Sequence, residues 1–249
     1  MTGAADWGAY LAGFHAQHPG ITEDVLGHAV DAQGLTAYDW AASKVAAGSV
    51  VLDLACGSGP MYARLRAATY VGLDLSRAEC LAAAARSVPV AQADVLHLPA
   101  GDHSVDIVLM SMALMLVPLP ATLAEVKRVL RPGGLYVATV PTSRPLPAGD
   151  RLRYARLGLA LGLVRFAYPN DRQLIRPEGT FAAAGLTLRE DNRRAFAYPV
   201  TTEHQADQLL TSLYLPNLHP NRFGAGLRVV RGWVGTDMAT PIRLFVATA

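Results

Sequence analysis

An acid and two glycines directly follow an apolar run near residue 50. The run covers residues 50–54 and contains Asp53, and Gly57 and Gly59 come next. Glycine has no Cβ, so the backbone can turn sharply and a ligand can approach it closely. An apolar strand that ends in such a turn is typical of a nucleotide-cofactor site. A dinucleotide fingerprint would need a third glycine where Tyr62 stands, which argues against NAD.

A second acid follows at the distance that one crossover requires. Residues 70–73 form a short apolar run that ends at Asp74, 15 residues after Gly59. This spacing predicts two parallel strands joined by a helix that begins at Pro60, where a missing N–H costs nothing. A carboxylate at Asp74 can accept both hydroxyls of a ribose.

Two further runs continue the pattern. Residues 88–93 lead into Asp94, and residues 106–110 form a fourth apolar strand. The carboxyl ends of parallel strands meet at one edge of an open α/β sheet, where ligands bind. We therefore expect Asp53, Asp74 and Asp94 to lie close together at that edge.

At this point the chain resembles the class I S-adenosylmethionine-dependent methyltransferases, in particular the small-molecule branch with the first motif Asp-x-Gly/Ala-x-Gly-x-Gly. The resemblance covers residues 45–141 and includes Leu-Arg-Pro-Gly-Gly-Leu at 130–135, before a fifth strand at 136–140. It implies an α/β fold with a Rossmann-like, doubly wound sheet of seven strands, the last of them antiparallel. It also implies S-adenosyl-L-methionine as the cofactor.

The resemblance assigns roles to individual residues. In such enzymes the acid that matches Asp53 organises the loop and the cofactor's amino group, and the acid that matches Asp74 binds the ribose. The backbone of residues 55–59 cradles the methionine part, Asp94 matches the position that contacts the adenine amino group, and Ser111 matches one that often holds the methionine amino group. The implied cofactor-binding residues are Asp53, Ala55, Cys56, Gly57, Gly59, Asp74, Leu75, Asp94, Val95 and Ser111.

Two departures from the family pattern bear on the site. Ala55 replaces the commoner first glycine, a mild change if this position needs only right-handed helical or extended dihedrals. Relatives often carry histidine near positions 114 and 115, where this chain has Leu114 and Met115. The pocket wall beside the reactive methyl group is therefore expected to be apolar, although methionine at such spacing also suits core packing.

Composition is compatible with one catalytic domain over residues 1–249. The hydrophobic content of 51% supplies a core, no run reaches the ~20 apolar residues of a membrane span, and the N-terminus lacks the regions of a signal peptide, so we expect a cytoplasmic protein. Cys56 and Cys80 are expected to be reduced thiols. Neither cysteine has a partner at metal-ligand spacing, so no metal is predicted.

Charge is distributed unevenly along the chain. Residues 1–143 carry 8 Lys and Arg against 12 Asp and Glu, whereas residues 144–249 carry 14 arginines against 8 acids. Arginine pairs with carboxylate or phosphate, which raises an anionic substrate or RNA as a partner. A solvated arginine-rich face is the simpler interpretation. No basic run is interleaved with aromatics, so nucleic acid is not expected to bind. The oligomeric state stays open.

The segments around residues 48–141, the cofactor-binding core, are expected to select the substrate. Residues 1–47 predict a helical lid, with aromatics at helical spacing, a break at 18–20, a new helix capped by Thr22 and another from Thr36 to 45. An aromatic stripe that merely covers the sheet is the alternative. Residues 142–176 predict an insertion whose helix at 151–166 is apolar nearly all round. It is either a buried cap over the pocket or a helix that touches lipid, and we favour the cap.

Residues 177–249 are expected to complete the sheet. A helix at 177–184, a sixth strand starting at 186–188 and a seventh strand at 242–247 match the end of the methyltransferase fold, whereas 213–233 looks loop-rich and is placed at the substrate entrance. The leading function is methyl transfer to a small, largely apolar organic molecule, with a cyclisation or rearrangement on the same fold as the alternative and RNA methylation as a weaker one. Candidate catalytic groups are His15, His219 and Tyr10; Tyr38 and Tyr214 are further candidates for orienting a substrate hydroxyl.

Overall fold

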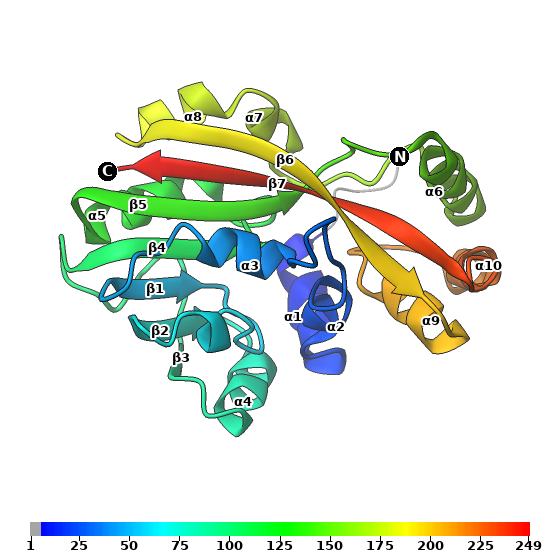
Figure 1. Ribbon diagram of the computed structural model, residues 1–249, viewed down its shortest axis with the longest axis horizontal. Helices are drawn as coiled ribbons and strands as arrows, with labels where there is room; N and C mark the ends of the chain where they lie inside the picture. Colours follow the sequence, from blue (N-terminus) through cyan, green and yellow to red (C-terminus); the bar gives the residue numbers. More distant parts are fainter. Residues whose placement is uncertain (1–5) are drawn as a thin grey trace.

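The computed structural model describes residues 6–249 and contains one seven-stranded sheet with the order β3-β2-β1-β4-β5-β7-β6 (Figure 1). Strands β1 to β5 are parallel, and β7 lies antiparallel between β5 and β6. The predicted doubly wound sheet with an antiparallel last strand is confirmed. The strands are β1 Val50–Leu54, β2 Thr69–Asp74, β3 Val90–Gln92, β4 Val105–Ser111, β5 Leu130–Pro141, β6 Thr187–Val200 and β7 Thr236–Thr248.

Ten α-helices and one 3-10 helix are found in the described residues. They are α1 Trp7–Gln17, α2 Ile21–Leu26, α3 Ala37–Ala42, η1 Tyr62–Arg64, α4 Arg77–Ala85, α5 Leu119–Val129, α6 Ala148–Leu161, α7 Asp171–Ile175, α8 Pro177–Ala183, α9 Glu203–Thr211 and α10 Pro220–Arg231. Each helix of residues 6–249 falls short of the length and apolar character that crossing a membrane requires.

Two hydrophobic cores lie on the two faces of the sheet. Strand β4 shows why, because its successive side chains point to opposite faces. Ile107 and Leu109 join α2, α3, α9 and α10 in one core, whereas Val108 and Met110 join α5 and α8 in the other. A strand covered on both faces must be apolar throughout, which explains the short unbroken runs in the sequence.

Three local predictions are wrong. No α-helix begins at Pro60, because the connection from β1 to β2 holds only the three residues of η1. Thr22 is not a cap, because α2 begins at Ile21 and its N-cap is Gly20. The φ of Gly20 is 80°, which only glycine adopts readily. The segment predicted as loop-rich, residues 213–233, contains the 12-residue helix α10, in which Pro220 takes the first position.

Strands β6 and β7 form a ribbon that reaches beyond the rest of the sheet. β5 pairs with β7 only from Leu135 opposite Thr248 to Pro141 opposite Ile242, but β6 and β7 stay paired as far as Val200 opposite Thr236. Figure 1 shows the ribbon extending toward α9 and α10, with α6 packed against α10.

Candidate active site

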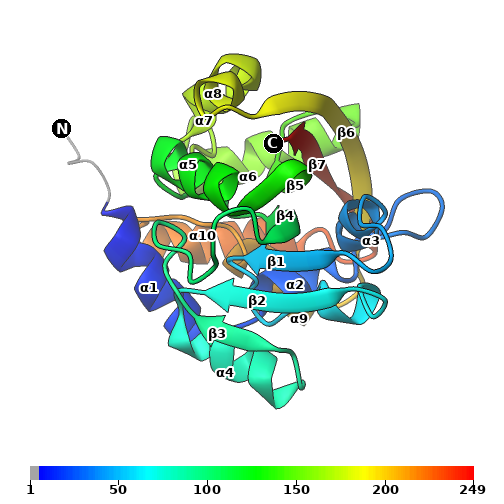
Figure 2. The same ribbon diagram turned by 90° about the vertical axis from the view of Figure 1, so that its left-hand side faces the viewer.

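A cavity of about 430 Å³ opens at the carboxyl ends of β1, β2 and β4. Helix α1 lies across the tips of β1 and β2 (Figure 2) and supplies one wall. The predicted cofactor-binding residues that line the cavity are Asp53, Ala55, Cys56, Gly57, Asp74, Leu75, Asp94, Val95 and Ser111. The sequence therefore placed these nine positions at one site, as the topology of parallel strands requires.

Asp53 brings an unused acceptor to the cavity. Its side chain is buried, with 1% of its surface exposed. The hydroxyl of Tyr70 donates to Asp53 Oδ2 at 2.7 Å, whereas Asp53 Oδ1 has no partner in residues 6–249. Burial, with a smaller effect from the charge of Asp74, raises the pKa of Asp53 to about 7. A cationic group in the cavity would satisfy Oδ1 and favour the ionised carboxylate.

The glycine turn is needed for two different reasons. Gly57 has a φ of 55° and lines the cavity, where a side chain would also add bulk. Gly59 has a φ of 80° and does not line the cavity; a Cβ there would lie 2.8 Å from both methyl groups of Val88. Gly59 thus serves packing between the loop and the residues before β3.

Ala55 corrects an expectation about this loop. Its φ is 51°, in the left-handed region, so the position does not have the right-handed or extended dihedrals that were expected. Such a conformation costs an L-residue about 1–2 kcal/mol. Met112, after Ser111 on the opposite wall, has a φ of 60°. Strained backbone of this kind concentrates where surrounding structure holds a site in place.

Asp74 is held by backbone donors. Gly57 N–H donates to Oδ2 at 2.8 Å, and Ser76 N–H donates to Oδ1 at 2.8 Å. Each carboxylate oxygen has two lone pairs, so both can still accept a bond from a ligand. Burial raises the pKa of Asp74. Asp94 is similarly oriented, because its Oδ1 accepts from Leu96 N–H at 2.9 Å.

A cluster that the sequence did not reveal joins α1 to α4. Glu79 Oε1 lies 2.8 Å from His15 Nδ1, and both carboxylate oxygens accept from the N–H of Gly20. Glu79 is 2% exposed. On the other side of the ring, His15 Nε2 lies 3.4 Å from the hydroxyl of Tyr214. Glu79 stands three residues after the N-cap Ser76, a place where an acid is readily interpreted as helix capping alone.

The other candidate catalytic residues differ in whether they line the cavity. Tyr214 lines the cavity, and burial raises its pKa to about 12, so its hydroxyl stays protonated at neutral pH. Tyr10 lies behind the wall, where its hydroxyl accepts from Leu215 N–H at 2.8 Å. His219 lies away from the cavity as the N-cap of α10. Tyr38 lines the cavity and is buried.

One side of the cavity is apolar. It is formed by Leu11 of α1 and by Met112, Leu116 and Val117 after β4. Leu114 and Met115, which prompted the expectation of an apolar wall, are fully buried in the core instead. The expected cap also differs, because α6 packs on α10 and contributes no residue to the lining.

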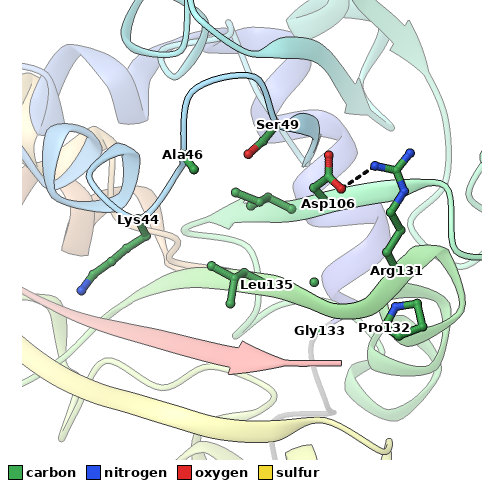
Figure 3. A pocket seen from close by; sticks show the side chains of 10 residues that line it. Lys44, Ala46, Ser49, Asp106, Arg131, Pro132, Gly133 and Leu135 are labelled. Carbon is green, nitrogen blue, oxygen red and sulfur yellow. Dashed lines mark hydrogen bonds and ion pairs between the residues drawn. The ribbon is translucent and has the colours of Figure 1, made fainter.

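A second hollow of about 300 Å³ lies at the opposite edge of the sheet (Figure 3). Its charged groups already have partners. Asp106 accepts from Arg131 and, at 2.8 Å, from Val50 N–H, and Lys44 donates to Glu190 at 2.7 Å. Asp106 therefore holds strand ends together, and this hollow offers no charged group to a ligand.

Comparisons with known proteins agree with this geometry. Residues 52–138 match the family described as Methyltransferase domain. A demethylmenaquinone methyltransferase from Lactobacillus johnsonii is 34% identical over 116 residues, which are 41% of this chain and 47% of that protein. The chain thus matches about half the length of this relative.

Solved structures share the fold at low sequence identity. The YcgJ protein from Bacillus subtilis is 16% identical with a TM-score of 0.57, over 85% of this chain and 97% of that one. The [4+2]-cyclase SpnF is 20% identical with a TM-score of 0.56, over 97% of this chain and 91% of that one. These likenesses show the fold alone.

Proposed function

We propose that this chain transfers a methyl group from S-adenosylmethionine to a small, largely apolar organic molecule. The match of residues 52–138 to the methyltransferase-domain family supports this proposal. One observation carries the proposal. The unpartnered Oδ1 of Asp53 and the carboxylate of Asp74 stand in the same cavity as an apolar wall. A cationic, ribose-containing cofactor and an apolar substrate therefore each find matching groups.

The residues fit S-adenosylmethionine part by part. Asp53 Oδ1 would accept from the ammonium group, the turn at Gly57 leaves room beside the backbone, and Asp74 has lone pairs for the ribose hydroxyls. Asp94 would accept from the adenine amino group. When bound, the sulfonium supplies an electrophilic methyl group, so the protein's task is to align a nucleophile and exclude water.

The apolar wall supports the substrate class. Leu11, Met112, Leu116 and Val117 would contact carbon-rich parts of a substrate and exclude water from the reacting atoms. The relative named above acts, by its name, on demethylmenaquinone, and a reduced demethylmenaquinone is therefore a suitable first probe.

His15 is the best-placed proton acceptor. If Nδ1–H donates to Glu79, the imidazole keeps the tautomer in which Nε2 carries a lone pair toward Tyr214 and the cavity. Nε2 could then take a proton from a substrate hydroxyl, with Tyr214 donating to the oxygen that remains. Glu79 acts through His15 as a positioning residue.

The test combines binding with product stoichiometry. Calorimetry should give binding of S-adenosylmethionine that Asp53→Asn weakens, with the variant still folded. Reduced demethylmenaquinone and other small apolar phenols are then incubated with methyl-labelled cofactor, and label should enter the organic product with one S-adenosylhomocysteine released per product.

The outcomes separate the alternatives. Product without released S-adenosylhomocysteine would favour the cyclisation or rearrangement, which uses the same cofactor residues. Label in RNA and salt-dependent RNA binding would favour RNA methylation. Several of the arginines in the second half are already ion-paired, as Arg231 is with Asp207 and Arg243 with Asp191, which weakens the case for RNA.

A further inference from the structure

Helix α6 has apolar side chains on two opposite faces. The inner face packs on the rest of the protein: Leu157 and Leu161 are buried, and Tyr154 donates to the carbonyl of Ala239 at 3.0 Å. Gly226 of α10 lets the two helices approach closely, because a Cβ there would lie 2.6 Å from Leu161. The inner face is thus fully accounted for by packing on α10 and the ribbon.

The outer face of α6 is an apolar stripe with no protein partner among residues 6–249. Ala148, Leu152, Ala155 and Leu159 are all exposed and follow at intervals of four, three and four residues, which places them on one side of the helix. Leu152 is 54% exposed and Leu159 is 78% exposed. Val164, three residues past the helix end, is also completely exposed.

Arginines border this stripe on both sides. At about 100° per residue, Arg151 and Arg156 fall on opposite edges of the outer face, and both are exposed. Neither forms an ion pair within the described part of the chain, whereas Arg153 on the flank donates to Asp150. Asp150 is the one acid of α6, and it is buried. The face is therefore basic as well as apolar.

We propose that the outer face of α6 binds an anionic lipid surface. A helix that lies in the membrane interface needs apolar side chains to enter the acyl region and basic side chains beside them to meet lipid phosphates. Leu152 and Leu159 supply the first, and Arg151 and Arg156 supply the second. With 14 residues the helix is ~21 Å long, so it lies along the surface rather than across it.

Charge argues against a second copy of the chain on this face. In a two-fold dimer the same surface patch meets itself, so the arginines that border the stripe would approach their own kind. No acid lies on the outer face to offset that repulsion. Anionic lipid phosphates complement the same arginines.

The proposed surface is also tied to the cavity wall. After α6 the chain reaches Asn170, whose side-chain amide donates to the carbonyls of Leu114 at 2.8 Å and Val117 at 2.7 Å. Tyr168 packs beside Trp7 of α1. The segment that follows α6 thus contacts the backbone of the apolar wall at Val117, but the lipid proposal does not depend on methyl transfer.

The test measures flotation of the full chain with vesicles of phosphatidylcholine alone or mixed with phosphatidylglycerol. Wild type should float with the mixed vesicles, and high salt should weaken the binding. Arg151→Gln with Arg156→Gln should lower vesicle affinity on the order of tenfold and reduce its salt dependence. Leu159→Ser should lower affinity at either salt concentration.

Matched variants elsewhere on the surface provide the controls. Leu81→Ser changes an equally helical, exposed leucine of α4, and Arg66→Gln with Arg189→Gln removes the same charge. Cofactor binding by calorimetry should be unchanged in all variants, which shows that they fold. The proposal is overturned if wild type fails to float with anionic vesicles, if the control variants lose as much, or if light scattering shows a dimer that Leu159→Ser dissociates while vesicles are ignored.

Discussion

The hydroxyl of Tyr70 donates to Oδ2 of Asp53, so that one carboxylate oxygen has a hydrogen-bond partner in residues 6–249 and the other, Oδ1, has none. This division matters because burial raises the pKa of Asp53, whereas the bond from Tyr70 lowers it. Tyr70 thus keeps the carboxylate within reach of ionisation near neutral pH while leaving Oδ1 for a cation.

Cofactor binding should depend on the ionisation of Asp53. With a pKa of about 7 in the free protein, affinity for S-adenosylmethionine should rise as the pH increases through that value. Titration of the cofactor's own amino group is common to wild type and Asp53→Asn, so the difference between them isolates Asp53. Tyr70→Phe should move the transition to higher pH. Parallel pH profiles for wild type and Asp53→Asn would contradict this assignment.

Asp53 should make the cofactor-free protein less stable as the pH rises, whereas it makes cofactor binding stronger. The pKa of Asp53 in the folded protein lies above its value of about 3.9 in an unfolded chain. Its contribution is therefore fully present below pH ~4 and is lost as the pH rises toward 7. The melting temperature of wild type should fall over this window relative to that of Asp53→Asn.

Asp74→Ala should weaken the binding of S-adenosylmethionine at least about tenfold. It removes two charge-assisted bonds to the ribose hydroxyls, each worth roughly 1.5–3 kcal/mol. It also removes the acceptor for Gly57 and Ser76 N–H, so part of the loss would be loop disorder. A 2′,3′-dideoxy analogue separates the two, because its binding should suffer less from the substitution. Calorimetry with unchanged affinity for the natural cofactor would rule out the ribose contact.

Asp94→Asn should weaken binding of the adenosyl cofactor, because an amide is a poorer acceptor for the adenine amino group than a carboxylate. An inosine-type analogue, which lacks that amino group, should distinguish little between wild type and the variant. Equal losses for both ligands would place Asp94 elsewhere, for example in holding its own loop through Leu96 N–H.

His15→Gln should lower the rate of methyl transfer at saturating cofactor by about 10²–10⁴-fold, if Nε2 accepts the substrate's proton. Cofactor affinity should change little. His219→Gln is the matched control, since His219 lies outside the cavity and should be dispensable for the rate. Loss of rate in both variants, or an unchanged rate in His15→Gln, would assign the base to another group.

Helix α1 should behave as a lid whose ordering accompanies ligand binding. None of its residues is buried, and its contacts include the bond of His15 to Glu79, the bond from Leu215 N–H to Tyr10, and the packing of Phe14 on Tyr214. Elements with few buried contacts open most readily. Hydrogen exchange should show α1 amides protected only with cofactor and substrate present, and deletion of residues 1–20 should abolish turnover with the sheet intact. Protection in the free protein equal to that of β4 would make α1 static.

The sheet and the cofactor edge could be predicted because their signals are local and repeated. Each of the first three strands is an apolar run with an acid at or near its end, and parallel topology brings those ends together whatever the intervening loops do. Asp53, Asp74 and Asp94 line the same cavity for this reason, and their roles toward a cofactor stay predictions.

What escaped prediction depends on contacts between distant segments. The pairing of His15 with Glu79 joins residues 64 apart in the chain, and no spacing rule encodes it. Helix α10 was missed because Pro220 and its glycines usually mark loops, yet Gly226 is required there for close contact with α6. The left-handed Ala55 likewise reflects a tertiary environment that overrides a residue's own preference.

The projecting ribbon of β6 and β7 has a consequence for how this protein can diversify. A two-stranded ribbon twists more easily than a wide sheet. Helix α9 directly follows the end of β6, and Tyr214 comes three residues after α9. Substitutions between Ala195 and Val200 could therefore shift Tyr214, which lines the cavity, without disturbing the aspartates at the opposite end of the strand order. The residues that contact the acceptor of the methyl group could therefore change during evolution while the cofactor-binding residues at the ends of β1, β2 and β3 stay the same.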